Sequence, residues 1–133
     1  MPNRPLHFFL VDDNDIDLAV NAKLIRLLGV PCQVSPFRNC VEFLKAIEGS
    51  MIENSQERLI LLIDIQMPVM SGFECVDHLT KFKSETLQKF QIFMLSANID
   101  KEQIDQASLF PCIHKLLEKP LDVFQLKQLV SSL

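Results

Sequence analysis

The fold of this chain is decided by residues 59–72, LILLIDIQMPVMSG, where an unbroken apolar run ends at a single carboxylate. Five apolar residues lead into Asp64, and Pro68 and Gly72 follow it closely. Such a short run, bounded by polar residues and turn formers, predicts a strand that is buried on both faces. An ionised carboxylate is costly to bury, so Asp64 should lie where the strand ends and water or a cation can reach it. Ligands bind at the carboxyl ends of the strands in open α/β sheets, which makes Asp64 the candidate reactive group.

The length and composition predict one folded domain that covers residues 1–133. The chain has 133 residues, 48% of them hydrophobic, which is enough for one core and too few for two. Its net charge of −4 gives no reason to expect a nucleic acid partner. The N-terminal apolar run is too short for a signal peptide, and no run approaches the length of a membrane span. We therefore expect a cytoplasmic protein that does not contact a membrane.

The cysteines support the same location. The chain has four of them, Cys32, Cys40, Cys75 and Cys112, and none forms a C-x-x-C pair. This spacing argues against a zinc site and against a disulfide framework. It predicts reduced, buried thiols, which are usual in the cytoplasm.

Five segments have the pattern of strands, and helical patterns follow them. The strands are expected at residues 7–11, 32–37, 59–63, 91–95 and 112–117. Apolar residues recur at helical spacing after each strand, so five helices are expected. This alternation implies right-handed crossovers, a parallel sheet and helices on both of its faces. The predicted architecture is a three-layer α/β sandwich.

Capping residues and apolar stripes place the expected helices. Caps are expected at Asn39, Asp100, Asp122 and either Asp15 or Asp17. The stripe of the second helix extends to Met51, and that of the last helix extends to Leu133.

Polar side chains follow four of the five strands, and in a parallel sheet all carboxyl ends lie at one edge. These side chains are Asp12, Asp13, Asp64, Ser96 and Lys119. Carboxylates brought together repel one another, which raises their pKa values unless a cation neutralises them. Oxygen ligands favour a hard ion, and Mg²⁺ fits because it takes one or two carboxylates and leaves room for phosphate oxygens. With a hydroxyl and an ammonium on the other flank, the set predicts a carboxylate nucleophile for phosphoryl transfer.

Four motifs carry a resemblance to a known family. FLVDDN, LLIDIQMPVMSG, FMLSAN and EKPL occur in this order and span most of the chain. The set resembles the receiver domain of two-component response regulators, in particular a stand-alone, single-domain member. The resemblance implies a flavodoxin-like sheet of strand order 2-1-3-4-5. It also implies that a phosphohistidine donor, on a histidine kinase or a phosphotransfer protein, phosphorylates one aspartate.

The resemblance also implies a role for each site residue. Asp64 is the phosphoacceptor, and Asp13 and Asp64 bind Mg²⁺ directly. The backbone carbonyl of Gln66 is a third protein ligand, and Asp12 acts through water.

On the other flank, the resemblance implies that Ser96 and Lys119 contact oxygens of the phosphoryl group. It makes the Lys119–Pro120 bond cis, which is uncommon for X-Pro bonds. Gln66 and Asn98, each two residues after a site residue, hold positions that tune how fast water attacks the phosphoaspartate. The phosphoryl lifetime itself is left open.

One departure from the family pattern concerns the output. Receivers commonly carry Tyr or Phe three residues before the motif lysine, and this chain has Leu116 there. The usual Gly-Ala turn before the last strand is replaced by residues 109–112, LFPC. We expect normal phosphorylation at Asp64. We expect an atypical response on the face formed by the fourth helix, the fifth strand and the fifth helix, where a downstream protein would bind.

Two other functions fit the same architecture. A phosphohydrolase of the haloacid dehalogenase type also uses a strand-end Asp with Mg²⁺, but it needs a second Asp where this chain has Gln66. A flavodoxin that binds FMN is the other, but the acidic run of residues 12–15 would repel the FMN phosphate. The resemblance to receiver domains is therefore preferred. It predicts a signalling module that phosphorylates itself and slowly loses the phosphoryl group, and not an enzyme with a separate substrate.

Overall fold

A five-stranded parallel sheet forms the centre of the computed structural model, which describes residues 4–48, 52, 55–82 and 84–131. The strands are β1 (Leu6–Val11), β2 (Cys32–Phe37), β3 (Arg58–Asp64), β4 (Phe90–Ser96) and β5 (Ile113–Glu118). Their order across the sheet is β2-β1-β3-β4-β5, and every neighbouring pair is parallel. The predicted flavodoxin-like topology is confirmed, and each predicted strand agrees with the observed bounds to within one residue at either end.

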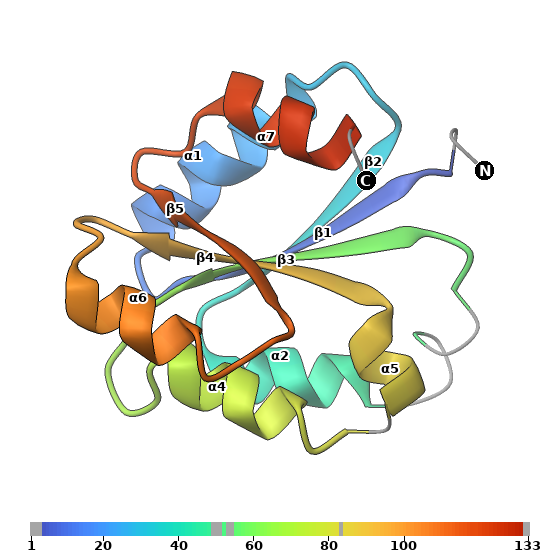
Figure 1. Cartoon of the computed structure of the whole chain (residues 1–133). Coiled ribbons are helices and arrows are strands. Elements are labelled where there is room, and N and C mark those ends of the chain that lie inside the picture. Colours follow the sequence, from blue (N-terminus) through green and yellow to red (C-terminus); the bar gives the residue numbers. More distant parts are fainter. Residues whose placement is uncertain (1–3, 49–51, 53–54, 83, 132–133) are drawn as a thin grey trace.

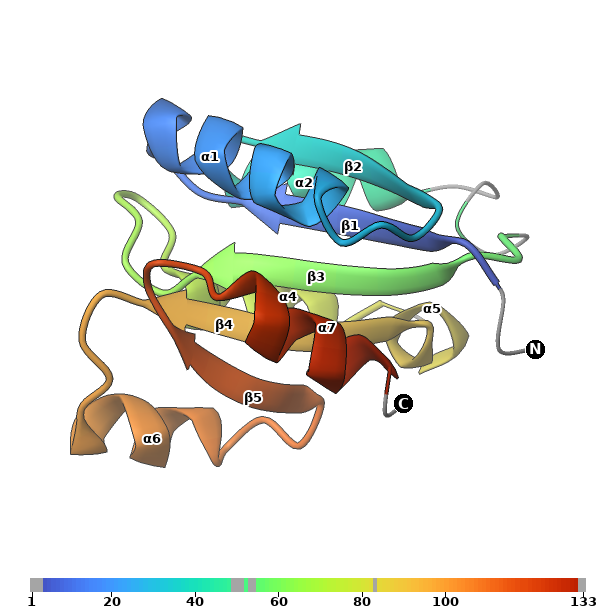
Figure 2. The same ribbon diagram turned by 90° about the horizontal axis from the view of Figure 1, so that it is seen from above.

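Helices cover both faces of the sheet, as Figures 1 and 2 show. On one face lie α1 (Asp15–Arg26) and α7 (Val123–Ser131). On the other lie α2 (Cys40–Ile47), α4 (Gly72–Leu79), α5 (Ser84–Gln88) and α6 (Lys101–Ala107). The predicted number of five helices is wrong because the short helix α5 was not expected. Its sequence SETLQ buries only Thr86 and is too short to show an apolar stripe.

The central strand β3 separates two apolar cores. Leu59, Leu61 and Ile63 join the core beneath α2 and α4, whereas Ile60 and Leu62 join the core beneath α1 and α7. All five are at most 1% exposed, so the predicted burial of this strand on both faces is confirmed. Consequently, the strand brings its one carboxylate to the rim of the sheet with no freedom to shift register.

The helix caps follow the prediction except at α1. The side chains of Asn39 and Asp100 accept hydrogen bonds from the third residue of α2 and α6, and Asp122 accepts from backbone N–H groups at the start of α7. The cap of α1 is Asn14, which accepts from the backbone N–H of Asp17. The expectation of Asp15 or Asp17 was wrong because both lie inside the helix, whereas Asn14 precedes it with extended backbone. Met51 and Leu133 lie outside the described residues.

The expectation of four reduced thiols is also wrong. Cys40 on α2 and Cys75 on α4 form a disulfide, while Cys32 and Cys112 are free and only partly buried. The C-x-x-C test detects cysteines that are close in sequence, and this pair is 35 residues apart. The two helices pack side by side on one face, which brings the Cα atoms to 5.8 Å. Disulfides are rare in the cytosol, so the cysteines no longer argue for a cytoplasmic location.

Within the described ranges, no helix combines the length and the apolar character that crossing a membrane requires.

Candidate functional site

Three carboxylates meet at the carboxyl edge of β1 and β3. Val11 pairs with Ile63 in the sheet, so the next residues, Asp12 and Asp64, come out side by side. One oxygen each from Asp12, Asp13 and Asp64 lies within 4.8 Å of the others. Asp12 and Asp64 are 2% and 6% exposed, while Asp13 is open to solvent. The structure thus brings together the carboxylates that the sequence predicted to converge.

The ammonium group of Lys119 lies among these carboxylates. Its Nζ is 3.0 Å from Asp12 Oδ2, 3.1 Å from Asp17 Oδ2 and 3.4 Å from Asp64 Oδ2. The peptide bond to Pro120 is cis, as the resemblance implied, and the Lys119 backbone N–H donates to the Ser96 carbonyl at 2.7 Å. One cation therefore joins groups from β1, α1 and β3.

Asp17 was not predicted as a site residue. It lies in the first turn of α1, just behind the Asn14 cap, and this turn directs it back toward the strand ends. Its place four residues after Asp13 could have indicated this, because the first turn of the helix begins at the edge where the carboxylates gather.

Burial and neighbouring charges both shift the pKa values of Asp64 and Lys119. Burial raises the pKa of Asp64 above its usual value, the charge of Lys119 opposes this, and the charge of Asp12 adds to it. For Lys119, burial alone would lower the pKa, but the hydrogen bonds to Asp12 and Asp17 and the charge of Asp64 raise it overall. The ammonium form of Lys119 is thus strongly favoured, and it is the cation that makes ionised Asp64 tolerable at this edge.

The donor set fits a hard divalent cation. Asp12, Asp13 and Asp64 offer three oxygen ligands, and the exposed Asp13 leaves the cluster open to solvent on one side. The Gln66 side chain is exposed, and its backbone N–H donates to Asp64 Oδ1 at 3.4 Å. Gln66 therefore lies against Asp64 through its backbone.

The hydroxyl of Ser96 is hydrogen-bonded to a side chain of α6 and to the backbone of the loop after β4. Asp64 pairs with Leu95 in the sheet, so Ser96 follows at the same edge, as predicted. Its Oγ donates to Gln103 Oε1 on α6 at 2.8 Å and accepts from the backbone N–H of Asn98 at 3.2 Å. Gln103 was missed because a glutamine inside an expected helix gives no sign of the residue it faces. The side chain of Asn98 is exposed.

The loop after Asp64 depends on a glycine. The Gly72 N–H donates to the Ile65 carbonyl at 2.9 Å, which folds the loop back onto the end of β3. A Cβ atom at Gly72 would collide with the Asp64 carbonyl oxygen and lie 2.8 Å from Met94 Cε. The exposed Val69, at a φ of 69°, adopts the left-handed conformation that β-branched residues rarely take.

Leu116 lies half-buried on β5, beside α6. It lines a groove of about 370 Å³ between these two elements, together with Ile104 and Ile113. In the turn before β5, Phe110 stacks on Phe73 of α4 with ring centroids 6.2 Å apart. Leu116 thus borders a groove where the family pattern has an aromatic residue, and Phe110 packs on α4 in the turn where the pattern has Gly-Ala.

Comparisons with known proteins agree with this geometry. Residues 8–131 match the response regulator receiver domain family. Among curated proteins, the hybrid signal transduction protein dokA of Dictyostelium discoideum is 30% identical over 130 residues, 97% of this chain but 7% of that protein. Hybrid signal transduction histidine kinase G of the same organism is 25% identical over 126 residues, 95% of this chain and 3% of that protein. A response regulator receiver protein from Dyadobacter fermentans DSM 18053 superimposes with a TM-score of 0.85 and 28% identity, covering 96% of each chain.

Proposed function

The chain belongs to the response regulator receiver domain family, which accepts a phosphoryl group in two-component signalling, and we propose that Asp64 is the residue phosphorylated. The observation that carries the proposal is the convergence of Asp12, Asp13 and Asp64 within 4.8 Å, with the Lys119 ammonium among them. Asp64 is the last residue of the central strand β3, which is buried from Leu59 onward, so it is held in place by the sheet itself.

In this proposal, a carboxylate oxygen of Asp64 attacks the phosphorus atom of a phosphohistidine, and the imidazole leaves as the P–N bond breaks. The new group carries a charge of about −1.5 to −2. Lys119 lies 3.4 Å from the Asp64 oxygen before the reaction and is available to neutralise that charge. Ser96 lies at the same edge and supplies a hydroxyl donor once its proton is free.

We propose Mg²⁺ as the cofactor. Asp12, Asp13 and Asp64 would hold it, with the backbone carbonyl of Gln66 as a further ligand. When bound, the ion supplies positive charge for the oxygens of the transferred group. The chain contributes the two carboxylates other than the nucleophile, Asp12 and Asp13, and keeps them at the edge by the β1–β3 pairing.

The donor we propose is a histidine kinase or a histidine phosphotransfer protein. The similarity to the hybrid signal transduction protein dokA and to hybrid signal transduction histidine kinase G supports such a donor. We also propose that residues 1–133 form one receiver domain in the cytoplasm and that no nucleic acid takes part. The Cys40–Cys75 pair is at most 1% exposed, which shields it from the thiol reductants of that compartment.

We further propose how the signal is lost and how it leaves the domain. Gln66 and Asn98 both present exposed amides beside the site, where they can position the water that attacks the phosphoaspartate. A downstream protein would bind the face formed by α6, β5 and α7. This face should respond atypically because Leu116 lacks a ring and a hydroxyl.

The haloacid dehalogenase alternative has no support from the matches described above. Such an enzyme needs a carboxylic acid two residues after the nucleophile to act as general acid and base. Gln66 has no titratable group, and its side chain is exposed. The domain is therefore a signalling domain whose own chemistry is limited to gaining and losing one phosphoryl group.

The test is mass spectrometry after incubation with acetyl phosphate and Mg²⁺. The wild-type chain should gain one phosphoryl group, and Asp64→Asn should gain none. Asp77→Asn, which removes an exposed carboxylate from α4, is the matched control and should behave as the wild type does. Phosphorylation of the Asp64→Asn variant at the wild-type level would exclude Asp64 as the acceptor.

A further inference from the structure

Gln103 and Ser96 form a hydrogen bond that has no place in the reaction as described above. Ser96 Oγ donates to Gln103 Oε1 at 2.8 Å, and both residues are buried, with exposures of 3% and 9%. The Ser96 oxygen also accepts from the Asn98 N–H, so its donor and one of its acceptor positions are filled. A serine hydroxyl has one proton. It cannot be donated to Gln103 and to a phosphoryl oxygen on Asp64 at the same time.

We infer that Gln103 is a positioning residue that retains the Ser96 hydroxyl in the unphosphorylated protein and releases it when Asp64 is modified. This inference rests on the proposed function, because it assumes a charged group on Asp64. The group attracts the Ser96 proton, since hydrogen bonds to charged acceptors are stronger than those to a neutral amide. Gln103 then loses its hydrogen-bond donor. The Ser96 proton is thus donated either to Gln103 or to the group on Asp64, and these two states exclude each other.

The release should reach α6 because Gln103 is this helix's main anchor. Of the seven residues of α6, all of them described, Gln103 alone is buried. Its backbone N–H also donates to the Asp100 cap at 2.8 Å. One residue therefore connects the start of the helix to the strand end that carries Ser96.

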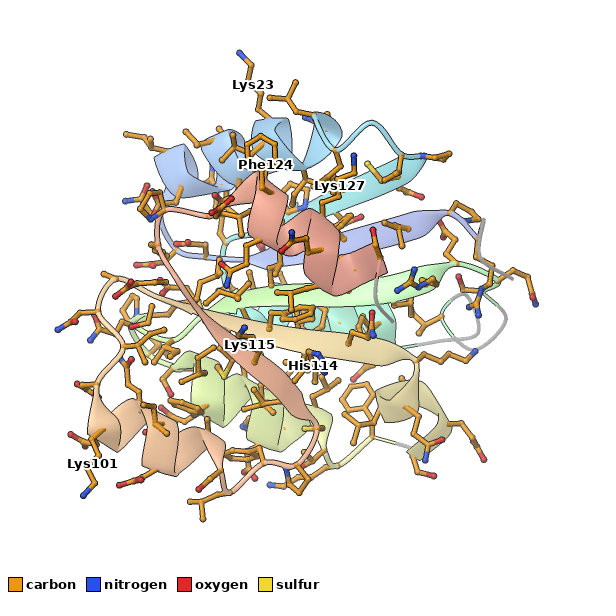
Figure 3. The ribbon with its side chains drawn as sticks, turned by 45° about the horizontal axis from the view of Figure 1, so that its top comes forward. Lys23, Lys101, His114, Lys115, Phe124 and Lys127 are labelled. Carbon is orange, nitrogen blue, oxygen red and sulfur yellow. A yellow bond between two sulfur atoms is a disulfide. The ribbon has the colours of Figure 1, made fainter. Side chains whose placement is uncertain are left out.

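Open space on two sides of α6 allows this helix to shift. A hollow of about 540 Å³ separates the loop after β3 from α6, with Gln66, Ser71, Gln103 and Gln106 among its lining residues. On its other side, α6 borders the groove that Leu116 lines on β5. Figure 3 shows His114 and Lys115 on β5 and Lys101 on α6, the two elements that border this groove. A shift of α6 would therefore change the groove without any aromatic residue at position 116.

The test compares Gln103→Leu with Gln106→Leu, which changes an exposed glutamine one turn along the same helix. Beryllofluoride, a mimic of the phosphoryl group, is titrated with Mg²⁺ and followed by amide chemical shifts. Without its acceptor, the buried Ser96 proton is unsatisfied until the mimic binds. Gln103→Leu should therefore bind the mimic about fivefold more tightly, the effect of one ordinary hydrogen bond. Gln106→Leu should bind as the wild type does. Unchanged or weaker binding in Gln103→Leu would overturn the inference.

A double-mutant cycle separates this role from a structural one. With Ser96→Ala in the background, the Gln103→Leu change should have no effect on affinity, and a persisting increase would refute action through Ser96. If Gln103→Leu does not fold, Gln103→Met keeps the side-chain length and should give the same increase, and the same affinity as wild type would overturn the inference. A wild-type chain that is not phosphorylated on Asp64 contradicts the proposed function. If the wild-type chain binds the mimic and Gln103→Leu binds it with the same affinity, only the present inference is contradicted.

Discussion

The two sides of the site differ in how far they are assembled. On the side of β1 and β3, Asp12 and Asp64 already lie around the Lys119 ammonium, within 3.0 to 3.4 Å of its Nζ. On the side of β4 and α6, the Ser96 hydroxyl is turned to Gln103. We call the first the acid side and the second the hydroxyl side. Phosphorylation of Asp64 can therefore start from the arrangement already present, whereas the signal requires the Ser96–Gln103 hydrogen bond to break.

The supports behind the two sides differ as well. Helix α4, which follows the Asp64 loop, is joined to α2 by the Cys40–Cys75 disulfide. Helix α6 is held by one buried glutamine and by half-buried apolar residues such as Ala107 and Phe110. The helix next to the acid side is therefore cross-linked to its neighbour by a disulfide, whereas the helix next to the hydroxyl side has one buried side chain.

The largest effect, on the free energy of unfolding, should come from removing the Cys40–Cys75 disulfide. Replacing both Cys40 and Cys75 by Ala removes a cross-link between residues 35 apart, which in the chain-entropy account lowers the free energy of unfolding by about 3–4 kcal/mol. Urea denaturation without reductant measures it. Cys32→Ala, a change at a free cysteine, is the control and should cost much less. A double variant as stable as the wild type would show that the acid side is not braced in this way.

The next effect concerns the cation of the acid side. Lys119→Met should slow the phosphorylation of Asp64 by acetyl phosphate about 100-fold, because one preorganised positive group is lost from the site. The rate is followed by mass spectrometry over time. Lys127→Met, at an exposed lysine of α7 that Figure 3 labels, should leave it unchanged. A rate within twofold of wild type for Lys119→Met would mean that the ammonium does not act on the transferred group.

A smaller effect tests the loop that carries the acid side. Gly72→Ala should lower the free energy of unfolding by about 2 kcal/mol, because its Cβ collides with the Asp64 backbone and forces the loop off β3. Gly29→Ala is the comparison: it has a φ of 75° but open space around a Cβ, so only about 1 kcal/mol is expected. Denaturant unfolding measures both. Equal costs at the two glycines would show that the loop after Asp64 is not tightly seated.

The smallest effect is the contribution of His7, which lies outside both sides of the site, to the pH dependence of stability. Burial lowers the pKa of His7 at the start of β1, and the charge of Glu57 only partly opposes this. The unfolded chain therefore takes up the His7 proton first, so stability should fall as the pH drops through about 6.5. His7→Gln should flatten this part of the curve, and His78→Gln, at an exposed site, should not. An unchanged slope in His7→Gln would assign the pH dependence to other groups.

The sequence predicted the fold and the acid side because both depend on strands. A strand buried on both faces has an unmistakable apolar pattern, and its end fixes where Asp64 lies. Two features that it did not predict, the disulfide and the Ser96–Gln103 hydrogen bond, depend on side chains that meet across packed elements. Cys40 meets Cys75 between α2 and α4, and Gln103 meets Ser96 between α6 and β4. Such contacts are set by how the helices pack on the sheet, and no local spacing encodes them.

The structure of the chain with Mg²⁺ and beryllofluoride bound tests the difference between the two sides most directly. Asp12 and Asp13 should keep their positions around Asp64. Ser96 Oγ should lie within hydrogen-bond distance of the mimic and more than about 3.5 Å from Gln103 Oε1. A structure in which the mimic occupies Asp64 while the Ser96–Gln103 bond remains intact would contradict this prediction.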